Sequence, residues 1–258
     1  MREQHPVFDA AISRDEPVWR YFDLPKFLSF LQRRALFFSR ADLLGDPLEG
    51  SFTKATAAQR EEWILNPPEG RTREDVEAVI RRNSELIKRF PRQVYINCWH
   101  RGVYDSMAMW RGYGAGPYGI AIRSSFGVLD DTLPKRFDCS GREESIYLGP
   151  VRYLDYHSVV ERIPHDNNVM GPFICKSLAY RHENEVRAVF VNLLELGDTS
   201  EGGPAGHFVG LDLVRLVHAV IVSPLAPRWY EEVVRGACTR FGFDFDVATS
   251  SVADPPIY

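Results

Sequence analysis

Residues 180–190 read YRHENEVRAVF, which combines strand-forming apolar residues with closely spaced charges. Side chains alternate between the two faces of a strand, so every second residue shares a side. We expect the apolar, core-facing side to consist of Val186, Ala188 and Phe190. The opposite side then carries Glu183, Glu185 and Arg187. The stretch therefore predicts a core strand with three charged residues on one side.

Two interpretations of the charged side stay open. Neighbouring carboxylates disfavour each other's ionisation, while a guanidinium beside them favours it, and such a group is a candidate active site. The same residues on a solvated strand face would form only a weak surface ion pair.

The composition indicates a folded chain with a substantial core. Of 258 residues, 45% are hydrophobic and 12% aromatic, enough for one large domain or two small ones. The net charge of −4 gives no general attraction to nucleic acid or membrane. No apolar run approaches the roughly 18 residues of a membrane span, and no signal-peptide core follows Met1. We therefore expect a cytoplasmic protein without a membrane partner.

Cysteine and histidine spacing predicts no metal site. No Cys-x-x-Cys, His-x-x-x-His or His-Glu-x-x-His pattern occurs, and the four cysteines are expected to be reduced thiols. The sequence also has no Gly-x-Ser-x-Gly nucleophile elbow. The glycine-rich residues 112–119 lack the Gly-Lys-Ser/Thr ending of a phosphate loop and precede a strand.

The first 50 residues predict a strand, a helix and a second strand in quick succession. Val18–Phe22 is a strand candidate, and Asp23 can cap a helix that has Pro25 in its first turn. Residues 35–39 form the second strand candidate. Residues 1–16 are polar, and we expect them to form an arm.

The rest of the chain mixes strands and helices without regular alternation. Residues 51–65 and 72–89 are predicted as two polar helices, forming an inserted helical hairpin within residues 51–92. Residues 17–50 and 93–258 would then form the core of a single α+β domain that spans residues 1–258. Residues 165–182 are predicted to be largely helical.

Arg20 is a candidate ligand-binding residue because it interrupts an apolar strand. An arginine on a core strand must find an anion, either a ligand phosphate or a structural partner such as Asp46 or Glu49. Ser39, at the end of the second strand, is a turn hydroxyl or a ligand contact. The aromatic residues Trp110 and Tyr113 either stack on a flat ring or belong to the core.

Several segments, taken in order, resemble the bacterial domain of unknown function 2971 family. They are Trp19-Arg20-Tyr21, Leu36-Phe37-Phe38-Ser39, Gly45-Asp46-Pro47-Leu48-Glu49, Ile96-Asn97-Cys98-Trp99, Met109-Trp110 to Tyr113, Gly119-Ile120-Ala121-Ile122 and Glu183-x-Glu185-x-Arg187. Gly45 and Leu48 depart from the Asn and Phe of the typical family form. This resemblance brings no activity with it.

The order of Arg20, Ser39 and Glu183-Asn184-Glu185 also resembles the ADP-ribosyltransferase fold. That resemblance implies a mixed, mainly antiparallel split sheet and NAD as substrate. It implies an ADP-ribosyltransferase or NAD glycohydrolase, of the kind found among toxins and defence effectors. Ser39 departs from the frequent Ser-Thr-Ser form, since it lies between Phe38 and Arg40.

The resemblance also implies roles for individual residues. Glu185 would stabilise the positive charge that develops on the ribose, and Glu183 would position or deprotonate the acceptor, a protein or nucleic acid. Arg20 would hold the pyrophosphate or the ribose. The remaining expected NAD-binding residues are Tyr21, Ser39, Trp110, Tyr113 and Arg187.

Two other functions stay open. One is a nonenzymatic domain that binds nucleotide, nucleic acid or protein, since the hairpin region carries Arg71, Arg73, Arg81, Arg82, Lys88, Arg89 and Arg92. Interleaved acidic residues favour an ordinary solvated face instead. The other is a metal-dependent nuclease that uses Asp46, Glu49, Glu183 and Glu185.

Overall fold

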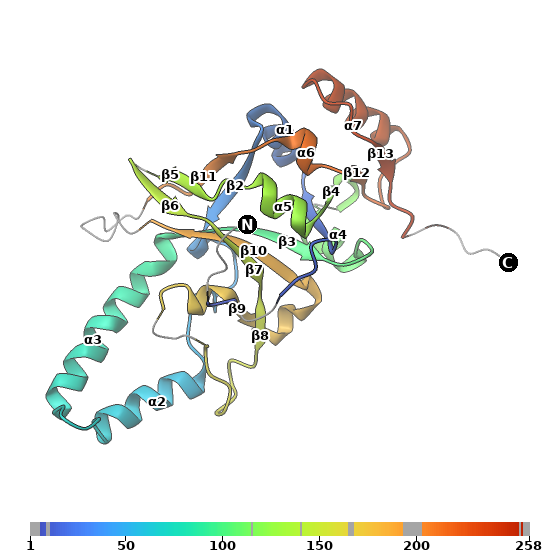
Figure 1. Cartoon of the computed structure of the whole chain (residues 1–258). Coiled ribbons are helices and arrows are strands. Elements are labelled where there is room, and N and C mark those ends of the chain that lie inside the picture. Colours follow the sequence, from blue (N-terminus) through green and yellow to red (C-terminus); the bar gives the residue numbers. More distant parts are fainter. Residues whose placement is uncertain are drawn as a thin grey trace.

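Strand β3 (Val94–Arg101) lies in the middle of the main sheet and has neighbours along both edges (Figure 1). The computed structural model describes residues 6–8, 11–114, 116–139, 141–164, 168–192, 203–252 and 254. Within these residues the sheet has nine strands, in the order β11-β2-β3-β1-β4-β12-β13, with β10 and β7 added beyond the other edge of β3.

The strands of this sheet are short and mainly antiparallel. Their bounds are β1 Pro17–Phe22, β2 Ala35–Arg40, β4 Ile120–Ser125, β7 Tyr147–Pro150, β10 Glu185–Val191, β11 Gly206–Gly210, β12 Ala219–Val222 and β13 Val247–Thr249. Among the described strands of this nine-stranded sheet, β12 and β13 are the one parallel pair. Two small sheets pair β5 (Arg136–Cys139) with β6 (Arg142–Ser145), and β8 (Arg152–Leu154) with β9 (Cys175–Ser177). The predicted α+β class with a mixed, mainly antiparallel sheet is confirmed.

The sheet splits along one edge of β3. Strand β2 pairs with the start of β3 through Ser39 and Ile96, whereas β1 pairs with its end through Trp19 and His100. Because β10 pairs along the whole of β3, β1 and β2 must share the opposite edge and diverge from each other. The amide of Asn97 closes part of the gap by donating to the Phe37 carbonyl oxygen at 2.8 Å.

Helix α1 (Leu24–Arg33) joins the two diverging strands, as the sequence predicts. Asp23 caps it by accepting from the Lys26 amide, and its apolar side is buried against the sheet. The other helices are α2 Lys54–Leu65, α3 Arg73–Arg89, α4 Met107–Tyr113, α5 Phe126–Thr132, α6 Leu213–Leu216 and α7 Trp229–Arg240, with 3-10 turns η1 Ala41–Leu43, η2 Phe90–Arg92, η3 Gly116–Tyr118, η4 Gly171–Ile174 and η5 Leu178–Glu183.

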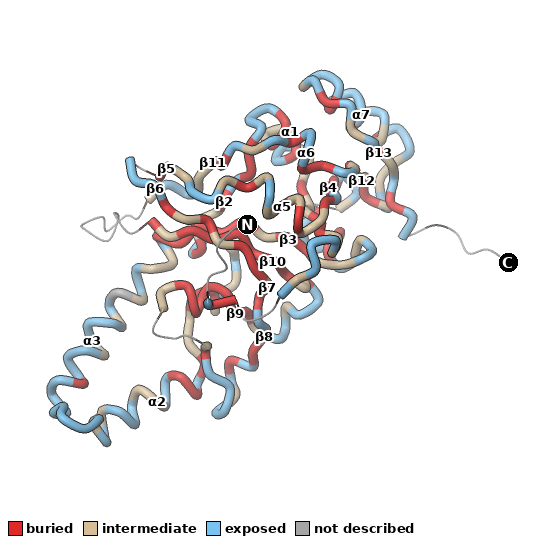
Figure 2. Tube along the Cα trace, viewed as in Figure 1, coloured by how far each residue is buried: buried red, intermediate tan, exposed pale blue. Residues whose placement is uncertain are grey.

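Helices α2 and α3 form a hairpin that extends away from the sheet (Figure 1). Most of its surface is exposed, in contrast to the buried strands beside it (Figure 2). This arrangement agrees with the two predicted polar helices. The division of the chain into a core and an insertion stays a prediction.

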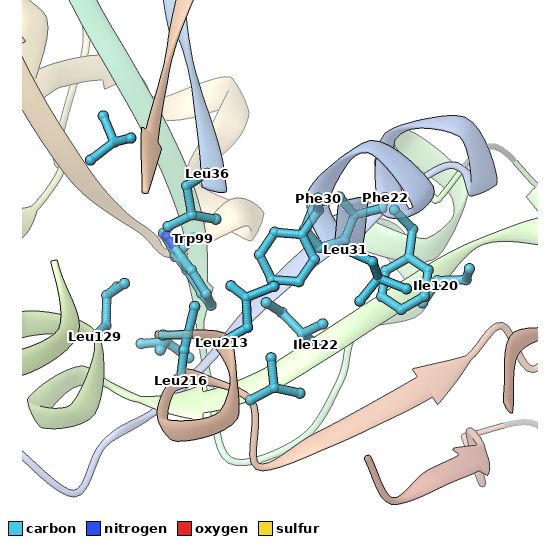
Figure 3. Close-up of a cluster of buried hydrophobic side chains, with 14 of the residues drawn as sticks. Phe22, Phe30, Leu31, Leu36, Trp99, Ile120, Ile122, Leu129, Leu213 and Leu216 are labelled. Atoms are coloured by element: carbon cyan, nitrogen blue, oxygen red, sulfur yellow. The ribbon is translucent and has the colours of Figure 1, made fainter. Parts of the chain in front are cut away.

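The larger core lies on one face of the sheet, where Trp99 of β3 is almost fully buried. Figure 3 shows part of this core, with Phe30 and Leu31 of α1 close to Ile120 and Ile122 of β4. The expected core-facing side of β10 belongs here, because Val186, Ala188 and Phe190 are members of the cluster. Alternation then directs Glu185 and Arg187 to the other face of the sheet.

A second core lies on that other face and includes two residues of the predicted N-terminal arm, which is therefore partly packed against the sheet. Val7 and Phe8 are buried in it beside Ile96 and Val189, because two apolar side chains in a polar stretch still gain from burial. Farther along, Arg14 pairs with Asp131 at 2.7 Å.

In the described part of the chain, no helix has the length and apolarity to span a membrane.

The prediction that residues 165–182 are largely helical, with an interruption near Gly171-Pro172, needs correction, because the described part has two short 3-10 helices and a strand but no α-helix. The described part of this segment, residues 168–182, contains η4, strand β9 and most of η5. Pro172 and the buried Phe173 and Ile174 hold the chain against the second core, and β9 then pairs in parallel with β8. Tertiary packing overrides local helical preference here.

Candidate functional site

A pocket of about 350 Å³ opens at the split in the sheet. Its lining residues come from β1, α1, β2, the turn that follows, β3, α4, β9, η5 and β10: Trp19, Arg20, Tyr21, Lys26, Phe37, Ser39, Leu43, Leu44, Ile96, Cys98, Trp99, His100, Met109, Tyr113, Lys176, Glu183, Glu185 and Arg187. Arg20, Ser39 and Glu185, far apart in the sequence, therefore meet in one cavity. Such concave, partly aromatic pockets with a few converging polar groups are typical of ligand sites.

Arg20 extends from β1 into the gap of the split sheet. Its Nη1 donates to the Cys98 carbonyl oxygen at 2.6 Å, which lies where neither β1 nor β2 pairs with β3. Its Nε is buried without a hydrogen-bond partner. Burial lowers the pKa of Arg20 to about 10, which leaves it protonated at neutral pH. Of the structural partners expected for Arg20, Glu49 bonds Arg187 instead, and Asp46 accepts from the Leu48 amide. The unpartnered N–H group of Arg20 suits a ligand anion.

Glu185 begins β10 and is held by two cations. Its Oε1 accepts from Arg187 Nε at 2.6 Å, and its Oε2 lies 3.3 Å from Lys176 Nζ. Burial raises the pKa of Glu185, but the charges of Arg187 and Lys176 outweigh burial and lower the pKa to about 2. Glu185 is therefore a carboxylate, suited to an electrostatic role and not to donating a proton.

Arg187 is fully buried, and all five of its N–H groups have acceptors. Nε and Nη2 bond Glu185, Nη1 and Nη2 bond both oxygens of Glu49, and Nη1 also bonds the Phe173 carbonyl oxygen at 2.6 Å. The charges of Glu185 and Glu49 overcome burial and raise the pKa of Arg187 well above its usual value. Arg187 lines the pocket, but it has no free donor for a ligand and instead fixes Glu185.

Glu183 lies outside the strand, which corrects the predicted strand over residues 183–190. It ends η5, and Asn184 then adopts a left-handed conformation with φ 39° before β10 begins. The Asn184 side chain supports this turn by donating to the Arg101 carbonyl oxygen at 2.7 Å. Glu183 nevertheless reaches the pocket, where its two oxygens accept from Tyr113 Oη and Lys176 Nζ. The solvated-face interpretation is wrong, because Glu183, Glu185 and Arg187 are all buried.

Lys176 of β9 was not among the residues expected in the site. Its ammonium lies between the two carboxylates, and it also lies 4.7 Å from the centre of the Tyr180 ring. Burial lowers the pKa of Lys176, while Glu185 and Glu183 raise it, and the net shift is upward. In the sequence, Lys176 directly follows the apolar residues 172–175 and precedes Ser177. A lysine at the end of such an apolar segment is the one sequence signal for this residue.

The predicted aromatic residues occupy different places. Tyr113 is half exposed at the pocket and donates to Glu183, and burial together with Glu183 raises its pKa. Tyr21 lines the pocket and accepts from the Ser106 amide at 2.9 Å. Trp110 is fully buried behind Tyr21, at a centroid distance of 4.9 Å, and it does not line the pocket.

His100 is a further pocket residue that the sequence interpretation did not select. Its Nδ1 lies 2.6 Å from the Glu183 carbonyl oxygen, a contact in which the ring nitrogen donates. Burial lowers the pKa of His100, so the ring is neutral near pH 7. The ring thus ties β3 to the end of η5 and helps to place Glu183.

Three of the four carboxylates expected in a metal-dependent nuclease are already engaged by cations. Glu49 pairs with Arg187, while Glu183 and Glu185 contact Lys176. Asp46 uses Oδ1 to accept from the Leu48 amide at 2.9 Å. Over the described ranges, no group of three or more His, Cys, Asp or Glu side chains is placed to hold a metal ion.

The charges of the hairpin are exposed and locally balanced. Arg73 pairs with Glu77 at 2.8 Å and Lys88 with Glu85 at 3.3 Å, each within one or two turns of α3. This agrees with an ordinary solvated face and gives no specific support to a nucleic-acid interface.

Comparisons with known proteins give only distant likenesses. No family model matches the chain, and no curated protein matches it. Two solved structures of Thermus sp. 2.9 DarT, one in complex with carba-NAD+ and one in complex with NAD+, align with 93% of this chain and 97% of theirs. Their sequence identities are 10% and 11%, and both TM-scores are 0.37. At that distance they add nothing to the argument about this site, and the resemblance to the 2971 family stays a prediction.

Proposed function

We propose that the chain cleaves the nicotinamide–ribose bond of NAD and transfers ADP-ribose to an acceptor or to water. One observation carries this proposal: Arg20, Ser39 and Glu185 line a single pocket where β1 and β2 diverge from β3. Their order in the sequence had suggested this chemistry, and the pocket gives them a common place to act.

The residues fit NAD in charge and shape. Arg20, with its unpartnered Nε, would bind the pyrophosphate. Ser39 is half-buried, and its hydroxyl makes only a 3.3 Å contact to the carbonyl oxygen of Arg40, so it can turn toward a ribose or amide. Tyr21 and Tyr113 offer aromatic surface, whereas Trp110 would support Tyr21 from behind.

Glu185 would supply the main electrostatic effect on the reaction. The bond between ribose C1′ and the nicotinamide nitrogen breaks, and its electron pair leaves with neutral nicotinamide. Positive charge then develops on the ribose, where the ionised carboxylate stabilises it and orients the 2′-hydroxyl. The acceptor attacks C1′, and its proton would pass to the Glu183 carboxylate or to water. Arg187 would hold Glu185 in place instead of binding NAD itself.

The test is nicotinamide release from NAD, measured beside Glu185→Gln. This substitution keeps the shape of the side chain and removes its charge, so we expect kcat to fall about 10²- to 10³-fold. Glu77→Gln, at an exposed hairpin position, is the matched control and should retain the parent rate. Thermal unfolding of each variant shows whether the fold is intact.

Two outcomes would count against the proposal. A folded Glu185→Gln protein that releases nicotinamide at the parent rate removes Glu185 from the reaction. A parent protein that releases none, with or without nucleic acid or cell extract, favours a nonenzymatic nucleotide-, nucleic-acid- or protein-binding domain.

A further inference from the structure

Lys176 is a buried lysine that contacts both carboxylates of the pocket. Its Nζ donates to Oε2 of Glu183 and lies 3.3 Å from Oε2 of Glu185. The side chain is only 9% exposed, so water does not share these contacts to any large extent. A lysine bears the cost of such burial only when paired.

A count of the buried carboxylates and of the cations paired with them shows what the Lys176 ammonium contributes. Among the described residues, three buried carboxylates, Glu49, Glu183 and Glu185, form direct ion pairs with two cations, Lys176 and Arg187. Without Lys176, Arg187 would be left to pair directly with these carboxylates, and its five donors are already committed to Glu49, Glu185 and the Phe173 carbonyl oxygen. Within the described part of the chain, Glu183 would keep one side-chain donor, the Tyr113 hydroxyl.

Among the described residues, no other cation bonds both Glu183 and Glu185. Arg20 lines the same pocket and interacts electrostatically with Glu185, but its hydrogen bond goes to the Cys98 carbonyl oxygen. The other charged or titratable groups around the cluster are Glu49 of the loop before α2, Cys98 and His100 of β3, Tyr113 of α4, Tyr153 of β8, Tyr180 of η5 and Arg187 of β10.

We propose that Lys176 is a positioning residue of this pocket, whose ammonium bridges the Glu183 and Glu185 carboxylates and holds them side by side. The positioning role rests on the proposed function. The charge balance is a property of the folded chain, whether or not the chain cleaves NAD.

The first experiment follows the urea midpoint of unfolding against pH for Lys176→Met. With the ammonium removed, one carboxyl of the pair binds a proton in the folded state at a pH where it is ionised in the unfolded chain. The folded state then holds more protons, so the midpoint must fall as pH rises from about 5 to about 8, relative to the parent. Lys88→Met, which breaks an exposed pair with Glu85, is the matched control.

A double variant keeps this test decisive if Lys176→Met folds poorly. Lys176→Met with Glu183→Gln removes one positive and one negative charge together, so it should be more stable than Lys176→Met alone and lose the added pH dependence. A protein that folds only as the double variant supports the proposal. The proposal is overturned if Lys176→Met has the pH dependence of Lys88→Met, or if the double variant is no more stable than Lys176→Met.

The second experiment is the pH profile of kcat for nicotinamide release. Lys176→Met should gain an ionisation near neutral pH, with kcat falling about tenfold per pH unit below it, because one of the two carboxylates is then protonated. Lys176→Arg keeps the charge and should retain the parent profile. A parent-like profile in Lys176→Met would overturn the positioning role. A parent without activity would defeat the proposed function, while the urea series would still decide the charge role.

Discussion

The pocket and the helical hairpin use the same kinds of charged residue in opposite surroundings. In the pocket, Arg187 is fully buried and bonds two carboxylates and a carbonyl oxygen. In the hairpin, the Arg73–Glu77 pair is 2.8 Å long, but its side chains are 64% and 46% exposed. The shortest distances in the two regions are similar, so distance alone does not tell their roles apart.

Burial makes the difference between them. Water screens the hairpin pair, and an exposed pair of this kind contributes about 0–1 kcal/mol. Removing one member of a buried pair leaves a charge with neither water nor partner, which costs about 3–5 kcal/mol. Such buried pairs occur at the split of the sheet, where Glu185 and Arg187 line the pocket.

The largest contrast is expected between Arg187→Met and Arg73→Met. Arg187→Met leaves Glu49 and Glu185 buried without their guanidinium, so we expect a loss of about 3–5 kcal/mol in the free energy of unfolding. Arg73→Met should change it by about 0.5 kcal/mol or less. Urea unfolding at neutral pH measures both, and equal losses would remove the distinction between the regions.

A second contrast concerns acid. The pKa of Glu185 is lowered to about 2, despite burial, by Arg187 and Lys176. A lowered carboxyl pKa gives stability that is present above the ordinary value of about 4.3 and lost as pH falls toward 2, here on the order of 3 kcal/mol. Glu185→Gln should therefore lose less stability than the parent between about pH 4.5 and 2, because the Glu185 contribution is missing.

The hairpin provides the control for this acid experiment. Hydrogen bonds from Thr72 lower the pKa of Asp75, but that carboxylate is exposed. Asp75→Asn should therefore leave the acid dependence close to that of the parent. Burial raises the pKa of Glu49, although Arg187 lowers it, so Glu49 changes the acid dependence in the opposite direction to Glu185. Each variant is therefore compared with the parent over the same pH range. Parallel curves for the parent and Glu185→Gln would contradict the proposed role of Arg187 and Lys176.

A smaller contrast separates two glycines with left-handed backbones. Gly50 has φ +72°, and an added Cβ would stand 2.4 Å from the buried ring of Phe173, whose carbonyl oxygen bonds Arg187. Gly50→Ala should cost about 1–3 kcal/mol from overpacking, in addition to backbone strain. Gly70, at φ +81°, has open space around it, so Gly70→Ala should cost only the strain, about 1 kcal/mol. Thermal unfolding of the two variants would show no difference if Phe173 could move freely.

The sequence predicted those parts of the fold in which local pattern and tertiary packing agree. Asp23 and Pro25 mark the start of α1, and the alternation of Val186, Ala188 and Phe190 marks the buried side of β10. The pattern failed where three residues make an element. Strand β9 is too short to show a period, so Lys176 was assigned to a helix and left out of the site.

Long-range pairing set the other limit. Glu49 and Arg187 are separated by 138 residues, and only the split sheet and the loop before α2 bring them together. The sequence therefore suggested Glu49 as a partner for Arg20, whereas the structure gives it to Arg187. Whether a charged strand face is solvated also depends on what covers it, and here η5, β9 and the second core supply that cover.

The most informative single measurement is a crystal structure of the protein with carba-NAD, an analogue of NAD. The expected result is that the analogue binds in the pocket at the split of the sheet. Its pyrophosphate should lie within hydrogen-bonding distance of Arg20 Nε, and the ring that replaces the nicotinamide ribose should lie beside Glu185. Analogue bound elsewhere on the chain, or a pocket that stays empty at saturating analogue, would contradict it.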